Sequence, residues 1–518
     1  MENGIDLTMA TVEKLLNNPF SRQLLKFVCE KDECGNRLEL SLKYYATGKI
    51  DACWKCKFAG EIVSRIMNRI SKSFDIKEEK IKEIVSDPIF RRGVRNVLEG
   101  IAKYGVTRPQ IVNAPFLVVW DFTHVCNLKC KHCYQRADKP LPDELTTEEA
   151  KNLIDQLAEA GTVAIAFSGG EPLLRKDFLE VASYAKSKGF YIAVATNGTF
   201  ITEEVAKKIK EVVDYVEISL DGPDAKTHDN FRGIPGAFNK TIQGIKNCVK
   251  NGIYTCIATT VTRHNLKMVP KIKELAENLG VNRIIFFNFI PVGRGINISK
   301  DDIRPEEREI LLNYILKQNY SGCSLEILST APQFARVAVE HEKGIPLGHF
   351  YAGKDIKGKI EALAKFLGGC GAGRIYCCVE PNGDVQPCVF MPIKVGNVRE
   401  KRFLEIWHSS PVLRKLRNRS LLQGACATCE YKEICGGCRA RAYAYFNDIC
   451  APDPGCINNK EYWESRYLPQ IKIKRKLVPA TPLNQFQRIP MIPYVEKIAN
   501  EIKIKFDELS HKLGPLGK

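Results

Sequence analysis

The sequence has no run of 18 uncharged apolar residues, and its first residues lack the basic, apolar and small-residue pattern of a secretory signal. A membrane-spanning helix needs about 20 consecutive apolar residues, and a signal peptide needs an apolar segment before a small-residue cleavage site. No low-complexity tract interrupts the chain. We therefore expect a cytoplasmic protein without a membrane-spanning helix.

Acidic residues are the minority among the charged ones. The chain of 518 residues contains 60 Asp and Glu against 77 Lys and Arg, which gives a formal net charge of +17. This excess favours an anionic partner, such as nucleic acid, membrane headgroups, or a substrate with carboxylates or phosphates, and charge alone does not choose among them. At roughly 150 residues per domain, the length predicts two to four compact units.

Cysteine, by contrast, is abundant, with 20 residues. Disulfides rarely persist in a reducing compartment, so we expect most of these cysteines to bind metal ions or iron–sulfur clusters. They form an early, a middle and a late group: Cys29, Cys34, Cys53 and Cys56; Cys126, Cys130 and Cys133; Cys370, Cys377, Cys378, Cys388, Cys426, Cys429, Cys435, Cys438, Cys450 and Cys456. Three others, Cys248, Cys256 and Cys323, stand alone and are expected to be small buried hydrophobic residues.

The middle of the chain repeats one unit, a short β-rich apolar run followed by a helical stretch of 10 to 15 residues. Such alternation predicts a parallel sheet with helices around it, and six units favour a partial, open α/β barrel over a closed barrel of eight. The six runs are 116–122, 163–167, 191–195, 215–220, 254–261 and 283–290. Functional residues are then expected at the carboxyl ends of the strands.

The rest of the chain divides around this barrel, which we place at 114–295. Residues 1–113 are predicted to form a helical domain that contains the early cysteines. A connecting region covers 296–368, a cysteine-rich module covers 369–457, and a basic amphipathic tail covers 458–518.

The most informative motif is Cys126-Asn-Leu-Lys-Cys130-Lys-His-Cys133-Tyr134, directly after the first barrel strand. Three thiolates on one loop can hold three irons of a [4Fe–4S] cube and leave the fourth iron open for chemistry. The alternative is a zinc site with His132 or His124 as fourth ligand. The motif and its place resemble the radical S-adenosylmethionine (AdoMet) superfamily, whose fold is a partial (β/α)6 barrel similar to a TIM barrel.

The resemblance extends to later strand ends, beginning with Ser168-Gly-Gly-Glu-Pro172 after the second strand. In that superfamily this motif binds the amino group of the AdoMet methionine, which implies this role for the Glu171 carboxylate. The resemblance implies AdoMet contacts for Tyr134, Gly169, Gly170, Glu171, Asn197, Ser219, Asp221, Thr260 and Val292. We assign no residue as the general acid or base.

The late cysteines resemble the SPASM domain, which carries two auxiliary [4Fe–4S] clusters, although CxxC pairs alone also suit zinc knuckles. The resemblance implies an outer cluster on Cys426, Cys429, Cys435 and Cys456. It implies an inner cluster on Cys370, Cys388 and Cys438, with Cys378 or Cys377 as fourth ligand or with an open position. Residues 434–456 look most like the SPASM enzymes of siroheme-derived heme and heme d1 synthesis.

The early cysteines, Cys29, Cys34, Cys53 and Cys56, have a spacing suited to a tetrahedral zinc site with four thiolates. A further iron–sulfur cluster and the absence of any metal are the alternatives. The expected role is structural.

The resemblance implies an enzyme that cleaves AdoMet reductively, with electrons from a ferredoxin or flavodoxin, and modifies an unactivated C–H bond oxidatively. Basic amphipathic segments at 62–74 and in the tail suggest peripheral attachment to the inner membrane face and a lipid substrate, with C–C bond formation. The alternatives are side-chain decarboxylation or removal on a heme precursor, with Arg439 and Arg441 on its propionates, and peptide maturation. A non-enzymatic RNA-binding protein would not need the 168–172 motif, so we expect no nucleic acid.

Overall fold

The computed structural model describes residues 17–74, 77–319, 324–341 and 368–465. Most of the predicted tail and two parts of the connecting region, 320–323 with Cys323 and 342–367, lie outside these ranges. The side chains of Arg69 and Lys72, two of the cations in the 62–74 segment, also lie outside them.

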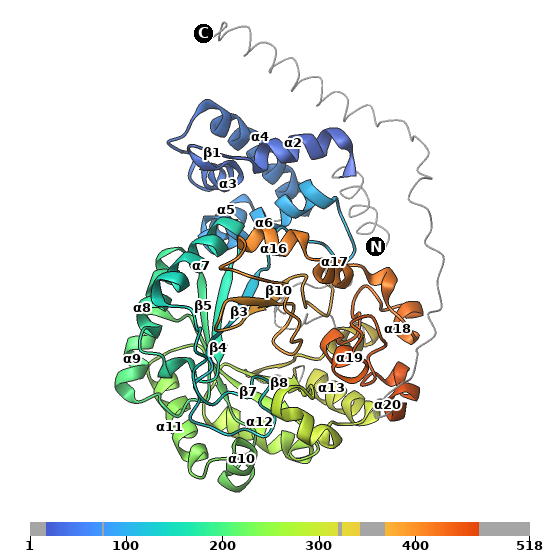
Figure 1. Cartoon of the computed structure of the whole chain (residues 1–518). Coiled ribbons are helices and arrows are strands. Elements are labelled where there is room, and N and C mark those ends of the chain that lie inside the picture. The colour runs from blue at the N-terminus through green and yellow to red at the C-terminus, as the bar shows by residue number, and fades with distance from the viewer. Residues whose placement is uncertain (1–16, 75–76, 320–323, 342–367, 466–518) are drawn as a thin grey trace, which may run out of the picture. The chain divides into compact units, whose positions relative to one another are not determined.

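A parallel sheet forms the centre of the protein (Figure 1). Six of its strands match the six predicted runs and confirm the partial α/β barrel: β3 (Leu117–Thr123), β4 (Ala164–Gly169), β5 (Tyr191–Thr196), β6 (Tyr215–Ser219), β7 (Thr255–Val261) and β8 (Arg283–Asn288). A seventh parallel strand that the pattern did not predict, β9 (Glu326–Ser329), pairs with β8.

The other edge of the sheet is extended by the cysteine-rich module. Its strand β10 (Tyr376–Val379) pairs parallel with β3, and β11 (Asp384–Gln386) and β12 (Gly396–Asn397) follow in antiparallel order. Within the described ranges no pairing joins β12 to β9, so the barrel is open. The wall of the barrel next to the first strand is therefore made by the module that carries the late cysteines.

The two faces of the sheet differ in side-chain size, and this difference creates both the core and the cavity. Bulky residues such as Trp120, Phe167 and Ile192 are fully buried in the main hydrophobic core. Helices packed around the sheet include α7 (Thr147–Ala160), α8 (Phe178–Ser187), α9 (Glu203–Val212), α10 (Ala225–Arg232), α11 (Ala237–Lys250), α12 (Val269–Asn278), α13 (Pro305–Asn319) and α14 (Gln333–Glu340). The opposite face of β4 and β5 carries Ala164, Ala166, Ala193 and Ala195, whose small side chains leave space inside the barrel.

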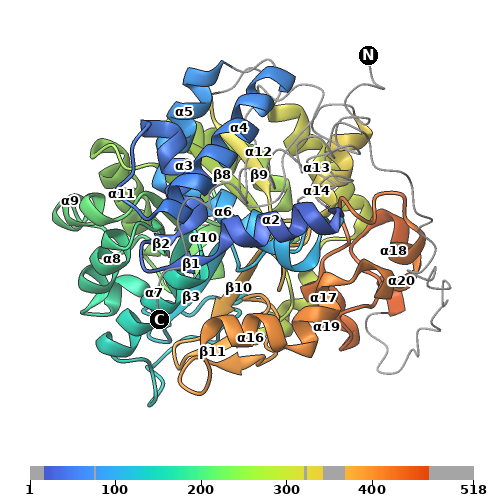
Figure 2. The same ribbon diagram turned by 90° about the horizontal axis from the view of Figure 1, so that it is seen from above.

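The N-terminal region is helical, as predicted, with α2 (Pro19–Cys29), α3 (Arg37–Thr47), α4 (Trp54–Phe74), α5 (Glu78–Ser86) and α6 (Pro88–Tyr104). A hairpin of β1 (Lys31–Asp32) and β2 (Gly35–Asn36) precedes α3. In Figure 2, which looks down on the molecule of Figure 1 from above, these blue helices lie together in front of the barrel. Arg92 and Arg95 of α6 donate to the Lys188 and Glu159 carbonyls, which places α6 at the amino ends of β4 and β5.

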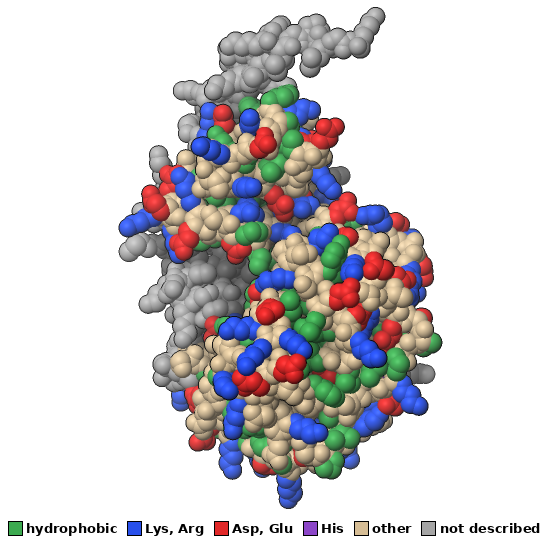
Figure 3. Space-filling model, turned by 90° about the vertical axis from the view of Figure 1, so that its left-hand side faces the viewer, with side chains coloured by type: hydrophobic (Ala, Val, Ile, Leu, Met, Phe, Trp, Pro, Cys, Tyr) green, Lys and Arg blue, Asp and Glu red, His purple; other side chains and the backbone are tan. Residues whose placement is uncertain are grey.

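The cysteine-rich module also contains α16 (Phe403–Ser409), α17 (Pro411–Arg417), α18 (Ala425–Thr428), α19 (Arg439–Phe446) and α20 (Glu461–Ser465). Of the described helices, none combines the length and the apolar character that crossing a membrane requires. On the face shown in Figure 3, basic and acidic side chains are interspersed. In the 62–74 segment, Ile62 and Val63 are buried, whereas Ile66 is 49% exposed.

Candidate active site

A cavity of about 460 Å³ occupies the interior of the barrel. It brings together the three middle cysteines and six of the nine side chains or backbones expected to contact AdoMet. Its lining includes Cys126, Cys130, Cys133, Tyr134, Gly169, Gly170, Asn197, Ser219 and Thr260. Sequence motifs more than 100 residues apart therefore meet at the carboxyl ends of the strands, where the barrel fold places function.

The loop that carries the middle cysteines is fixed by backbone hydrogen bonds to other loops. The Lys129 N–H donates to the Arg232 carbonyl, and the Arg294 N–H donates to the Cys133 carbonyl at 2.8 Å. The Arg294 guanidinium also donates to the Cys130 carbonyl. Gly293 allows this contact, because a Cβ there would lie 2.2 Å from the Tyr134 carbonyl oxygen. The sequence analysis missed the roles of Gly293 and Arg294, although both directly follow Val292, which it predicted to contact AdoMet.

The two glycines after β4 are required by their close approach to the same loop. The Gly170 N–H donates to the Thr123 carbonyl at 2.7 Å. A Cβ on Gly170 would lie 2.0 Å from the Val125 carbonyl oxygen, closer than any real contact, and one on Gly169 would lie 2.5 Å from that of Thr123. The structure thus gives the glycines of the 168–172 motif a steric reason.

Glu171, which is predicted to bind the AdoMet amino group, lies behind the cavity wall. Its carboxylate is fully buried and does not line the cavity. It accepts hydrogen bonds from the Thr196 hydroxyl at 2.7 Å, the Asn197 N–H at 2.8 Å and the Leu173 N–H at 3.2 Å. Burial raises the pKa of Glu171 to about 7, against these hydrogen bonds. In this structure the carboxylate holds the turn after β5, and only its neighbours Gly169, Gly170 and Asn197 reach the cavity.

Asp221 and Val292 also lie behind the cavity wall. Asp221 is fully buried, accepts from the Thr260 N–H at 2.8 Å and pairs with the Arg232 Nε at 2.6 Å. Arg232 itself lines the cavity and donates to the Cys130 Sγ at 3.7 Å. Burial raises the pKa of the Cys130 thiol, and the Arg232 charge opposes that rise. Ile290 lines the cavity, whereas Val292, the residue predicted to contact AdoMet, does not.

The three inner-cluster cysteines converge on a second, smaller cavity of about 60 Å³, which Cys370, Cys388 and Cys438 line together. Four residues line both this cavity and the large one: Asn288, Ile290, Tyr376 and Phe390. The Tyr376 hydroxyl donates to the Cys388 Sγ at 2.6 Å. The inner cysteines therefore lie directly beside the barrel interior.

Cys378 and Cys377, the candidates for a fourth inner ligand, are not part of this group. Side chains alternate along β10, so Tyr376 and Cys378 lie on one face and Cys377 lies on the other. Cys378 contacts Asp121 Oδ2 at 3.2 Å, in a buried group that also includes Glu380. Cys377 is buried in the main hydrophobic core. Neither lines the small cavity, so the described structure does not support either as the fourth ligand.

The four outer-cluster cysteines lie around the α18 and α19 segments. Burial and the neighbouring Cys456 and Cys426 raise the pKa of the Cys435 thiol. The Gly437 N–H donates to the Cys435 Sγ at 3.3 Å, and the Asn459 side chain donates to the Cys426 Sγ at 3.2 Å. Burial and the neighbouring Cys426 also raise the pKa of the Cys429 thiol. N–H donors aimed at sulfur stabilise thiolates, which is the form that binds iron.

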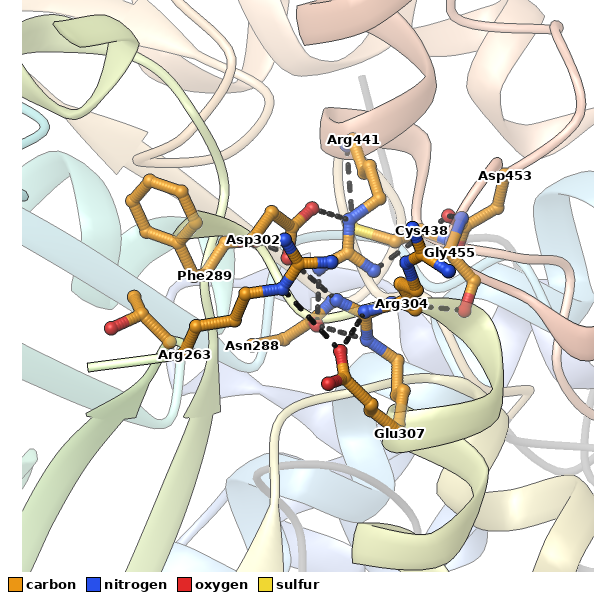
Figure 4. Close-up of polar contacts among 12 residues, drawn as sticks. Arg263, Asn288, Phe289, Asp302, Arg304, Glu307, Cys438, Arg441, Asp453 and Gly455 are labelled. Carbon is orange, nitrogen blue, oxygen red and sulfur yellow. Dashed lines mark hydrogen bonds and ion pairs between the residues drawn. The ribbon is translucent and has the colours of Figure 1, made fainter. Parts of the chain in front are cut away.

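A buried ionic network joins the barrel to the auxiliary module (Figure 4). Arg308 Nη2 pairs with Asp302 Oδ1 at 2.7 Å, and Arg441 lies 3.5 Å from Asp302 Oδ2 and 3.8 Å from Asp453 Oδ1. Arg441 also donates to the Phe289 carbonyl at 2.7 Å. The expectation that Arg439 and Arg441 bind substrate propionates is therefore wrong. Both are buried, and Arg439 donates to the carbonyls of residues 437, 449 and 451.

The early cysteines form a different group from the one predicted. Asp32, Cys34, Cys53 and Cys56 bring their ligand atoms within 4.8 Å of one another. Cys29 packs instead against the small hydrophobic core of the N-terminal helices. Burial and the nearby Glu99 raise the pKa of its thiol.

Comparisons with known proteins agree with these motifs. The family model of the radical SAM superfamily matches residues 120–276, and that of the SPASM iron–sulfur cluster-binding domain matches residues 370–439. Among solved structures, Streptococcus suis SuiB bound to S-adenosylmethionine has a TM-score of 0.58 at 16% identity, covering 82% of this chain and 93% of SuiB. That likeness shows the fold.

For three relatives, the match with this chain covers most of the relative's length. The AdoMet-dependent heme synthase of Methanosarcina barkeri is 39% identical over 350 residues, 67% of this chain and 97% of the relative. The Fe-coproporphyrin III synthase of the same organism is 37% identical, covering 67% and 90%. The mycofactocin maturase MftC of Mycolicibacterium smegmatis is 31% identical, covering 70% and 88%. The chain therefore belongs to the radical SAM superfamily and is a SPASM-containing enzyme that uses AdoMet and more than one [4Fe–4S] cluster.

Proposed function

We propose that this enzyme decarboxylates or removes carboxylate-bearing side chains on an iron tetrapyrrole. The observation that carries the proposal is the 39% identity with a heme synthase over 97% of that relative's length. A second relative, at 37% identity, is named for an iron coproporphyrin. We retain the five-part division of the chain, 1–113, 114–295, 296–368, 369–457 and 458–518, as part of this proposal.

The lining of the barrel cavity suits a flat, largely apolar ligand. Aromatic rings of Tyr191, Tyr215, Phe287, Phe289 and Phe390 line it, together with the alanines of β4 and β5. Ligand pockets of this kind bury most of an apolar ligand and keep a few polar groups for orientation. A macrocycle with carboxylate side chains has both a large apolar surface and polar groups that can orient it.

Arg294 supports the carboxylate part of this proposal. It lines the cavity, and two of its three guanidinium nitrogens donate to the Cys130 and Ala137 carbonyls at 3.0 Å. Its third nitrogen, Nη2, is buried and has no hydrogen-bond partner among the described residues. A buried guanidinium nitrogen without a partner is stabilised most by a hydrogen bond to an anionic acceptor.

We propose the cluster ligands from the same geometry. Cys126, Cys130 and Cys133 hold the cluster that binds AdoMet, Cys426, Cys429, Cys435 and Cys456 hold the outer cluster, and Cys370, Cys388 and Cys438 hold the inner one. With its cluster reduced by a ferredoxin or flavodoxin, bound AdoMet supplies a 5′-deoxyadenosyl radical. The barrel residues orient the substrate and exclude water from this radical.

In the proposed net reaction a carboxyethyl side chain loses one hydrogen atom from its inner CH2 group to the AdoMet-derived radical. The C–C bond to the carboxylate would then break, CO2 would leave, and an auxiliary cluster held by the late cysteines would take up one electron. A vinyl group remains. Four residues line both cavities, so a substrate bound in the barrel would lie beside the inner cysteines, and the path of this electron would be short.

The test is an anaerobic reaction of the reconstituted enzyme with AdoMet, dithionite and an iron coproporphyrin, analysed by mass spectrometry. We expect products that have lost one CO2 and two hydrogen atoms per reacted side chain. The matched control is the Cys126→Ala, Cys130→Ala, Cys133→Ala variant, which should form neither product nor 5′-deoxyadenosine. Turnover of AdoMet without any change in the tetrapyrrole would contradict the proposal.

The lipid interpretation finds no support. The relatives' names refer to heme, coproporphyrin or mycofactocin maturation, and part of the apolar stripe at 62–74 is used for packing within the N-terminal helices. A peptide substrate is the remaining alternative, because one relative at 31% identity is a maturase. If the substrate is a peptide, AdoMet turnover in the same assay should increase with a precursor peptide and not with the tetrapyrrole.

A further inference from the structure

We propose that the N-terminal region holds one zinc ion on Asp32, Cys34, Cys53 and Cys56. This site lies in a part of the chain that precedes the radical SAM and SPASM matches, and it is independent of the proposed reaction. It replaces the four-thiolate site that the cysteine spacing predicts, with an aspartate in the place of Cys29.

The separations among Asp32, Cys53 and Cys56 fit the edges of a single tetrahedral site, and the Cys34 ligand atom lies within 4.8 Å of the other three. With Zn–S bonds of about 2.3 Å and Zn–O bonds of about 2.0 Å, the edges of the tetrahedron are about 3.8 Å between sulfurs and about 3.5 Å between sulfur and oxygen. Cys53 Sγ and Cys56 Sγ lie 3.6 Å apart. Asp32 Oδ2 lies 3.4 Å from Cys56 Sγ and 3.8 Å from Cys53 Sγ.

The same distances disfavour an iron–sulfur cube at this place. Each thiolate of a [4Fe–4S] cube binds its own iron, so the ligand sulfurs are spread around a large inorganic core. All four ligand atoms here lie within 4.8 Å of one another, which leaves room for one ion. A mixed sulfur and oxygen set of four ligands suits Zn²⁺.

The chain supplies these ligands from a hairpin and a helix N-terminus. Asp32 ends β1, and Cys34 lies in the turn before β2. Cys53 precedes α4, and Cys56 lies in its first turn, where the positive end of the helix dipole favours thiolates. The Cys53 N–H also donates to the Cys34 Sγ at 3.3 Å, which brings the two parts together.

Arg37 holds the aspartate in the ligand position. Its side chain is 3% exposed, and its Nη2 donates to Asp32 Oδ2 at 3.1 Å. The Cys34 N–H donates to Asp32 Oδ1 at 3.0 Å. Hydrogen bonds that orient a ligating carboxylate are the usual outer partners of a metal site, and the Arg37 charge offsets part of the negative charge of three thiolates and a carboxylate.

A metal ion would also explain how so small a hairpin is stable. Both β1 and β2 contain two residues, and an isolated hairpin is marginal at best in water. A zinc ion that joins this hairpin to α4 supplies the missing stability. Lys31 of the same hairpin lies 3.7 Å from Glu159 at the end of α7, so the metal would indirectly fix a contact with the barrel.

The experiment measures zinc and iron per chain by mass spectrometry in the anaerobically reconstituted full-length enzyme after dialysis against EDTA. We expect about one zinc per chain in the parent and in Cys29→Ser. Cys56→Ser and Asp32→Ala should each lose most of the zinc and keep the iron and 5′-deoxyadenosine formation of the parent. Glu33→Gln, a neighbouring carboxylate outside the group, is the matched control and should retain zinc.

Hydrogen exchange gives a second measurement that does not depend on activity. Protection of the 31–36 hairpin should fall in Asp32→Ala and stay unchanged in Cys29→Ser. Loss of zinc from Cys29→Ser together with its retention in Asp32→Ala would overturn the proposal in favour of the four-thiolate set. A parent enzyme without zinc, or with additional iron that disappears in Cys56→Ser, would overturn it as well.

Discussion

Arg441 offers a sharp test of whether its guanidinium holds the structure together or binds substrate. Arg441 lies beside Asp302 and Asp453 (Figure 4). Arg308 also pairs with Asp302, so these two arginines and two aspartates carry no net charge together, and each of the four is at most 2% exposed. Met at position 441 is also unbranched but carries no charge. The replacement therefore leaves one negative charge without a partner in the interior. The change therefore tests the balance of buried charge directly.

Removing one member of a buried ion pair costs about 3–5 kcal/mol. The lower end, about 3 kcal/mol, applies here because the variant also relieves repulsion between the Arg441 and Arg308 guanidiniums. At about 2.1 cal/mol/K per residue, the unfolding entropy of 518 residues is about 1.1 kcal/mol/K, so the thermal midpoint should fall by about 3 °C.

The assay is anaerobic thermal unfolding of the reconstituted enzyme at a fixed scan rate. Arg402→Met is the matched control, because Arg402 pairs with Glu159 on the surface, where its side chain is 69% exposed. Surface pairs contribute about 0–1 kcal/mol, so the control should shift the midpoint by at most about 1 °C. A midpoint for Arg441→Met equal to that of the control, with product formation lost, would refute this reasoning and restore a role in substrate binding.

Three further variants test the site. Cys435→Ala should lose the outer cluster and lower product yield, while 5′-deoxyadenosine still forms, because the cluster that binds AdoMet lies elsewhere; iron content and product ratio measure this. Gly170→Ala should abolish AdoMet cleavage and spare the auxiliary iron, because its Cβ would lie 2.0 Å from the Val125 oxygen, whereas Gly93→Ala meets only ordinary contacts and should keep activity. Burial raises the pKa of Glu217 to about 7, so its protonated form stabilises the fold at low pH and this contribution is lost as pH rises from about 4.5 to 7. In Glu217→Gln the thermal midpoint should therefore decrease less over that pH range than in the parent. A decrease equal to that of the parent would contradict the raised pKa of Glu217.

The barrel could be predicted from sequence because its signals are local. Each of the six predicted runs is a stretch of apolar residues next to a helical pattern, and the cofactor motifs stand at the ends of these runs. The strands β9 and β10 have four residues each, too few to show a period. In β10 the adjacent Cys377 and Cys378 suggested metal ligands, whereas the structure uses both inside a strand.

The partners of individual side chains could not be predicted in the same way. Glu171 was assigned to AdoMet because of its motif, yet its carboxylate is used by Thr196 and Asn197, 25 and 26 residues later. Arg232 reaches Cys130 across 102 residues, and no spacing rule connects them. Asp32, the proposed zinc ligand, escaped the sequence analysis for another reason, since a search for cysteines passes over an aspartate two residues before Cys34. A turn of the form Asp-Glu-Cys-Gly was the signal that sequence reasoning could have used.

The arrangement of β10 suggests why the auxiliary module and the barrel act as one unit. Strand β10 hydrogen-bonds to β3, the strand that leads into the Cys126 loop, and its Tyr376 lies between the barrel cavity and the inner cysteines. On the barrel side, Asn288 at the end of β8 lines both cavities and accepts hydrogen bonds from Arg308 and Arg441. A shift of the module would therefore disturb the paired strand, the ionic network and the cavity wall together. In the proposed reaction, electron exit from a substrate radical would need a short and fixed distance to an acceptor, and these three connections would hold the inner cysteines at such a distance from the barrel cavity.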